Sequence, residues 1–111
     1  MFEYSAKLVR IIDADTLELD VDLGFKIWHR MVVRLDGLDA PERKSVGHKS
    51  ALDWLTIQVT GKGPLKIRTK KDKQEKFGRY LAEVFYSTDT PSINQQMIAV
   101  GYAVAYQGGK R

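Results

Sequence analysis

The chain has 111 residues, enough for one hydrophobic core but too few for two, so we expect a single domain over residues 1–111. It has no cysteine, which excludes disulfides and thiolate metal sites, and only two histidines, which argues against a histidine-rich zinc site. The formal charge of +4, with an isoelectric point near 9.4, favours a polyanionic partner without identifying one.

No apolar run approaches the roughly 20 residues that a membrane-spanning helix needs, so we expect no membrane partner. Residues 1–4 lack the basic stretch followed by an apolar one that begins a secretory signal. A cytoplasmic location is therefore expected, although secretion stays open if a signal has been removed.

The first third of the chain predicts three β-strands. Residues 7–12 form the first, and a turn at residues 13–15 separates it from the second, at residues 16–23, where apolar and polar residues alternate strictly. Gly24 then turns the chain into a third strand at residues 25–36.

The remaining chain mixes helices and strands. Apolar residues recur at helical spacing over residues 46–60, and Gly61 predicts a left-handed end for this helix. A fourth strand at residues 65–69 leads into an exposed basic loop at residues 70–76, and a fifth strand follows at residues 79–86.

A second helix is predicted after the fifth strand. Ser92 and Gln95 have the spacing of a capping box, and Gly101 marks the expected end. The residues expected to face inward are Ile93, Met97 and Val100.

Charged residues concentrate at residues 34–42, where an apolar strand ends in a turn marked by Gly37 and Pro41. Arg34 has the opposite parity to Leu35, so its side chain should point out of the main hydrophobic row. Functional groups at strand ends stay open to a ligand while the scaffold holds them.

Two further clusters accompany this turn: an acidic one at residues 13–16 and one at residues 76–79 that includes Arg79. Carboxylates suit a hard cation, and guanidinium groups match phosphate, so together they suggest a cation beside an anion. Basic residues also crowd one third of the chain. They are Lys62, Lys66, Arg68, Lys70, Lys71, Lys73 and Lys76.

The three clusters, in this order, resemble the staphylococcal nuclease (thermonuclease) family over about residues 9–106. The resemblance implies a mainly β fold with helices (α+β), namely the five-stranded OB-fold, a Greek-key barrel, with two helices. Five strands with a helix between the third and fourth agree with that architecture.

The resemblance also implies roles for the charged residues. The carboxylates of Asp15 and Asp39 and the backbone carbonyl of Ala40 match the calcium ligands of the family, which makes Ca²⁺ the expected cofactor. Glu42 matches the catalytic glutamate that activates or orients water, and Arg34 and Arg79 match the arginines that clamp the phosphate. Taken singly, each residue has a simpler explanation as a turn, helix-start or solvated strand-end residue.

Three more residues match positions that contact the nucleotide in the family: Lys76, Phe77 and Tyr106. Phe77 stands where the family has a tyrosine, so it can stack on a base but cannot bond a terminal phosphate. For Phe77 and Tyr106, packing against the barrel is an equal alternative. Asn94 matches a family asparagine with a buried structural role.

The function that the resemblance implies is a calcium-dependent endonuclease that hydrolyses DNA, RNA or both and leaves 3′-phosphate ends. The alternative is a non-catalytic OB-fold module that binds single-stranded nucleic acid, although the catalytic motif residues are all present. A structural or interaction role is a third hypothesis.

Two departures from the family bear on behaviour. Residues 43–47 form a shorter loop than relatives carry, which should open the metal side of the site and alter substrate affinity more than chemistry. The sequence stops at residues 107–111, where relatives continue into a third helix. We therefore expect uncovered apolar surface, and with it marginal stability or self-association.

Overall fold

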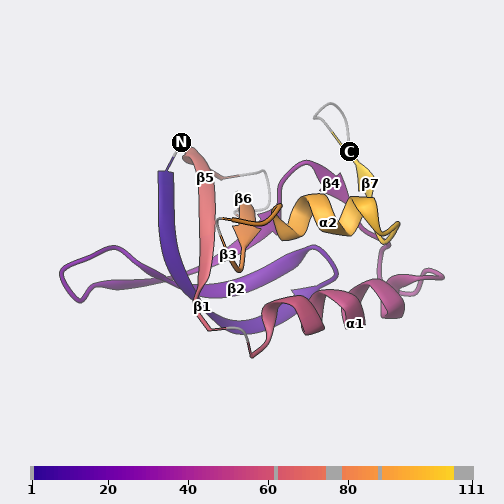
Figure 1. Ribbon diagram of the computed structural model, residues 1–111, viewed down its shortest axis with the longest axis horizontal. Helices are drawn as coiled ribbons and strands as arrows, with labels where there is room; N and C mark the ends of the chain where they lie inside the picture. Colours follow the sequence, from indigo (N-terminus) through magenta and orange to yellow (C-terminus); the bar gives the residue numbers. More distant parts are fainter. Residues whose placement is uncertain (1, 62, 75–78, 88, 107–111) are drawn as a thin grey trace.

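The computed structural model describes residues 2–61, 63–74, 79–87 and 89–106, which form two α-helices and seven strands (Figure 1). The order is β1 (Phe2–Asp13), β2 (Thr16–Asp22), β3 (Trp28–Leu35), β4 (Leu38–Asp39), α1 (His48–Val59), β5 (Leu65–Gln74), β6 (Tyr80–Phe85), α2 (Ile93–Ala99) and β7 (Val104–Ala105).

Five of the strands close into a barrel in the order β1-β2-β3-β6-β5, with β5 pairing back onto β1. Neighbouring strands run antiparallel except β3 and β6, which are parallel. This confirms the expected barrel with two helices. The strict alternation in β2 correctly predicted which of its faces is buried: Leu17, Leu19 and Val21 all lie in the core.

The helices close one side of the barrel. The buried residues of α1 are Ala51, Leu55 and Val59, as its helical spacing predicted. α1 contacts β1, α2 contacts β6, and the two helices contact each other (Figure 1). None of the described helices is both long and apolar enough to cross a membrane.

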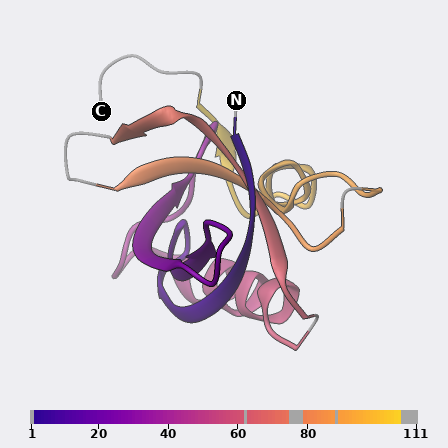
Figure 2. The ribbon, with the colours of Figure 1, turned by 90° about the vertical axis from the view of Figure 1, so that its left-hand side faces the viewer.

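The β2–β3 hairpin corrects the expected third strand, which begins at Trp28 and not at residue 25. Phe25 and Lys26 both have positive φ, and the Ile27 amide donates to the Gly24 carbonyl across a tight turn. Positive φ at two adjacent positions matches the twist of a hairpin but is uncommon for bulky residues, so composition did not signal it. The hairpin extends away from the helices (Figure 1) and faces the viewer in Figure 2.

Two further expectations are wrong. Residues 70–74, predicted as an exposed basic loop, belong to β5, and Gln74 pairs with Tyr80 after an irregularity. Val100, predicted to face inward, is 54% exposed. The cause is that α2 ends at Ala99, and the chain reverses at Gly101 (φ 89), where the Tyr102 amide bonds the Met97 carbonyl in a Schellman motif.

Candidate active site

The site is built where two strand ends meet. Asp15 lies in the turn between β1 and β2, and Thr16, the first residue of β2, pairs with Arg34 near the end of β3. The Leu35 amide donates to the Asp15 carbonyl at 2.8 Å, which fastens the turn to β3. β3 then continues through Gly37 into β4, which carries Asp39. The pairing of these strands therefore brings Asp15 and Asp39, which are 24 positions apart in the sequence, to the same residue, Arg34.

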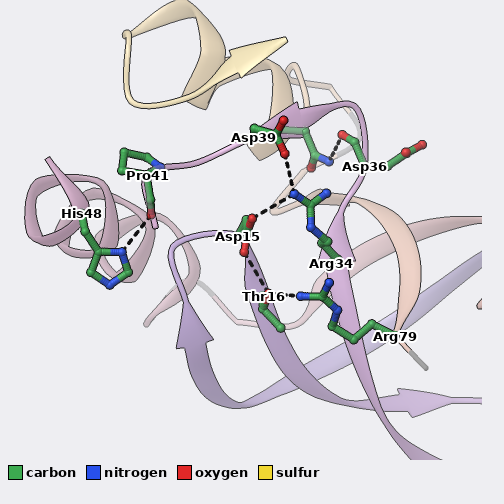
Figure 3. Close-up of polar contacts among 9 residues, drawn as sticks. Asp15, Thr16, Arg34, Asp36, Asp39, Pro41, His48 and Arg79 are labelled. Atoms are coloured by element: carbon green, nitrogen blue, oxygen red, sulfur yellow. Dashed lines mark hydrogen bonds and ion pairs between the residues drawn. The ribbon is translucent and has the colours of Figure 1, made fainter. Parts of the chain in front are cut away.

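Arg34 lies between the two carboxylates (Figure 3). Its Nη2 atom is 2.7 Å from Asp39 Oδ1 and 3.2 Å from Asp15 Oδ2, and its side chain is only 6% exposed. The other terminal nitrogen, Nη1, is buried and has no hydrogen-bond partner among the described residues. The parity prediction for Arg34 therefore gave the correct face of β3, but that face is covered at this point.

Arg79 is linked to the carboxylate of Asp15 through the hydroxyl of Thr16 (Figure 3). The Arg79 Nη1 atom donates to Thr16 Oγ1 at 3.3 Å, and Thr16 Oγ1 donates to Asp15 Oδ1 at 2.9 Å. Thr16 is 2% exposed. The structure thus brings the two arginines and the two acidic turns together, and Thr16, which sequence reasoning did not single out, links Arg79 to Asp15.

The turn that presents Asp39 is held from both sides. Gly37 has φ 83, a conformation that favours glycine, and its carbonyl accepts from the Tyr106 amide at 2.8 Å. Asp39 pairs with Val104 in the short sheet of β4 and β7, which the sequence did not predict. Tyr106, expected to contact the nucleotide, is half-buried directly after β7, so its backbone flanks the acidic turn.

Asn94 joins the same turn to the barrel. Its Nδ2 donates to the Asp36 carbonyl at 2.9 Å and to the Ala82 carbonyl at 3.0 Å, while the Val84 amide donates to its Oδ1 at 3.0 Å. The side chain is 3% exposed. These contacts agree with the structural role that the sequence suggested for Asn94.

Glu42 lies in the segment between β4 and α1 and is exposed. Its own carbonyl accepts from the Ser45 amide at 3.0 Å, and the preceding carbonyl, of Pro41, accepts from His48 Nδ1 at 2.9 Å (Figure 3). Nothing in the sequence marked His48 as an anchor of this segment. The Glu42 carboxylate forms no hydrogen bond or ion pair with the described residues, and the residue is exposed to solvent.

Not every predicted residue joins this constellation. Lys76 and Phe77 lie outside the described residues. Among the residues that are described, no group of three or more histidine, cysteine, aspartate or glutamate side chains is placed to hold a metal ion. The carboxylate part of the expected calcium set is therefore a pair, with Ala40, partly buried, following Asp39 directly.

The pair nevertheless fits a cation chemically. Asp15 and Asp39 each place a carboxylate oxygen within 3.2 Å of one guanidinium nitrogen, so they already lie close enough to share one positive group. Calcium accepts carboxylate, backbone carbonyl and water ligands in irregular geometry. The donors present, two carboxylates and the Ala40 carbonyl, are consistent with an open calcium site completed by water or substrate.

Comparison with known proteins places the chain in a family. An endonuclease described as uncharacterized, from Escherichia coli, is 30% identical over 102 residues, covering 91% of this chain and 60% of the relative. A probable endonuclease LCL3 from Yarrowia lipolytica is 31% identical over 84 residues, covering 68% of this chain and 36% of the relative. A protein of the same name from Candida dubliniensis is 34% identical over 84 residues, covering 70% of this chain and 35% of the relative.

The chain thus spans three fifths or less of the length of these relatives. The family described as Staphylococcal nuclease homologue matches residues 32–111, a range that includes the second half of β3, the acidic turn after it and Arg79. Because this match covers well over half of the sequence, the chain belongs to the family of staphylococcal nuclease homologues.

Proposed function

We propose that the protein is a nuclease that hydrolyses phosphodiester bonds in DNA, RNA or both. The observation that carries the proposal is the buried Arg34, which is held between Asp15 and Asp39 and whose Nη1 has no partner in the described part of the chain. A buried donor without a partner costs about 1–3 kcal/mol, and such a cost is accepted where a ligand completes the bond. The relatives named endonucleases support the same function.

Arg34 and Arg79 are proposed to bind the phosphate undergoing attack. Negative charge grows on the phosphoryl and leaving oxygens during the displacement, and a guanidinium stabilises this charge without giving up a proton. Arg34 has one terminal nitrogen, Nη1, that no described residue bonds, and Arg79 donates a hydrogen bond to Thr16 beside Asp15. The two groups thus flank the carboxylate turn and offer donors to one anion.

Asp15, Asp39 and the Ala40 carbonyl are proposed to hold Ca²⁺. The ion would supply electrostatic stabilisation of the phosphate and would orient water. Binding would also relieve the repulsion between the two carboxylates when the Arg34 guanidinium turns toward substrate. Calcium dependence and 3′-phosphate products are part of the proposal and rest on the family resemblance.

Glu42 is proposed as the residue that activates or orients the attacking water. A general base must be ionised at the working pH and within hydrogen-bond reach of the proton that it removes. Glu42 is exposed and lies three residues after Asp39, and no described residue forms a hydrogen bond or ion pair with its carboxylate. Tyr106, Lys76 and Phe77 are proposed nucleotide contacts.

The test is cleavage of labelled single-stranded DNA and RNA, each with calcium or with chelator, by the protein and two variants. Arg79→Ala removes a proposed phosphate ligand, and Arg30→Ala is the matched control, because Arg30 is bound to Asp20 near the hairpin. We expect calcium-dependent cutting that falls by about 10²–10³-fold in Arg79→Ala and persists in Arg30→Ala.

Two other outcomes would refute the proposal that this site is a nuclease active site. Equal cutting by Arg79→Ala and the unmodified protein would identify a contaminant or another site. Salt-sensitive binding of the labelled strands without any cutting would instead identify a binding module, the alternative that the OB-fold allows.

A further inference from the structure

The segment that carries Glu42 has neither strand nor helix structure from residue 40 to 47. Two of its residues have left-handed backbone conformations, Lys44 with φ 71 and Gly47 with φ 93. A segment of this kind has no ladder of backbone hydrogen bonds to fix its place. Ser45 bonds the Glu42 carbonyl within the segment, and the remaining contacts that fix the place of Glu42 come from side chains and from the two ends of the segment.

Arg43 makes such contacts. Its Nε is 2.5 Å from Asp13 Oδ1, and its Nη2 donates to the Ile12 carbonyl at 3.0 Å. Asp13 and Ile12 lie at the end of β1, directly before the turn that carries Asp15. The planar guanidinium thus bonds a carboxylate and a carbonyl at the same time, a geometry that a lysine cannot reproduce.

We propose that Arg43 is a positioning residue that fastens the Glu42 segment to the Asp15 turn. The inference rests on the proposed function of Glu42. Arg43 is the next residue along the chain, so the fork that it makes with Asp13 and Ile12 limits how far the Glu42 backbone can move from Asp15. At the other end, the bond from His48 to the Pro41 carbonyl holds the residue before Glu42.

A purely stabilising ion pair would behave differently. The Arg43 and Asp13 side chains are 66% and 31% exposed, and exposed pairs contribute little to folding because water and salt screen them. Positioning is more sensitive, because a shift of about 1 Å in a reacting group can slow a reaction by up to 10²-fold. The expected signature is a loss of kcat that exceeds any loss of stability.

A direct contact between Arg43 and substrate phosphate is the rival explanation. It predicts a higher KM for Arg43→Gln and no similar loss for Asp13→Asn, because Asp13 would then only compete for the arginine. The fastening predicts instead that both substitutions lower kcat, since either one breaks the same fork.

The experiment compares Arg43→Gln, Asp13→Asn, their combination, and Arg43→Lys at saturating calcium. Arg10→Gln is the matched control, because Arg10 is also 66% exposed and its Nε also binds a carboxylate, that of Glu18 at 2.7 Å. We expect each single change to lower kcat by about tenfold with KM within about twofold, and the combination to lower it no further. The kcat of Arg43→Lys should be lowered as far as that of Arg43→Gln, and the kcat of Arg10→Gln should equal that of the unmodified protein.

Amide hydrogen exchange at residues 42–46 gives a readout that needs no activity. We expect faster exchange there in Arg43→Gln and Asp13→Asn and no change in Arg10→Gln. An unchanged kcat, or a raised KM confined to Arg43→Gln, would overturn the proposal. If the unmodified protein cuts nothing, the proposed function fails. In that case unchanged exchange overturns the fastening as well, and faster exchange supports it.

Discussion

Arg34 shows what a residue's position in a strand does and does not determine. Alternation in β3 sets the face to which the side chain points, and that could be predicted from Leu35 alone. The 5% exposure of Arg34 depends on the acidic turns that cover this face, which come from β4 and from the β1–β2 connection. Such coverage is a tertiary property that no local pattern carries.

Arg34→Lys tests the value of the guanidinium. A lysine keeps the charge that offsets Asp15 and Asp39, but it is a point charge that cannot bond both carboxylates and still present a second nitrogen. We expect kcat/KM to fall by about 10²–10³-fold while the thermal midpoint changes little. Kinetics and calorimetry on the same preparation check this. A variant as active as the unmodified protein would show that only the charge matters.

Asp39→Asn tests the metal site. A ligand that binds only the folded state raises the free energy of unfolding by about 2.7 kcal/mol at 100 times its dissociation constant. We therefore expect calcium to raise Tm in the unmodified protein and to raise it far less in Asp39→Asn. Asp53→Asn is the control, because Asp53 is a surface carboxylate paired with Lys49. The same calcium shift in all three proteins would exclude Asp39 as a ligand.

At the scale of elements, patterns that repeat within one strand or helix were predictable. β2 and the buried face of α1 follow their periodicity, and the Ser92 cap accepts from the Gln95 amide as expected. The pairing of β4 with β7 could not be predicted, because each strand has only two residues and no period can be read from so short a segment. Val100 was misplaced because a helical period was extended past the true helix end.

Asn94→Ala tests the element that carries the site. The side chain bonds two carbonyls and one amide that link α2, β6 and the turn before β4, and it is buried. Its removal leaves buried groups without partners, so we expect a loss of about 2–4 kcal/mol in the free energy of unfolding, measured by urea titration. Gln95→Ala, on the exposed face of α2, should change stability by less than about 0.5 kcal/mol. Equal effects would mean that Asn94 does not anchor the turn.

At the scale of the whole molecule, charge is distributed in two ways. On the outer face of β1, β2 and β3, two arginines are matched by acidic partners: Arg10 binds Glu18, and Arg30 binds Asp20, where the hydrogen bond from Arg30 lowers the pKa of Asp20. This face therefore offers a polyanion little net attraction. The formal charge of +4 must act elsewhere, and the sequence concentrates lysines at residues 70–76.

Salt dependence of binding shows how many phosphates this charge engages. Each phosphate contact with a single strand adds about −0.7 to the slope of log affinity against log salt concentration. If only Arg34 and Arg79 take part, the slope is about −1.4, and binding through Lys70, Lys71 and Lys73 makes it steeper by about −2. Because the basic residues exceed the acidic ones by four, we expect the steeper value.

The measurement is fluorescence anisotropy of a labelled strand with chelator present, so that nothing is cut. Replacing Lys70, Lys71 and Lys73 together by glutamine should return the slope to about −1.4. Lys49→Gln should leave the slope unchanged, because Lys49 is already bound to Asp53. This hydrogen bond raises the pKa of Lys49. A slope of about −1.4 in the unmodified protein would restrict phosphate recognition to the two arginines. The lysine cluster would then have no part in holding the strand.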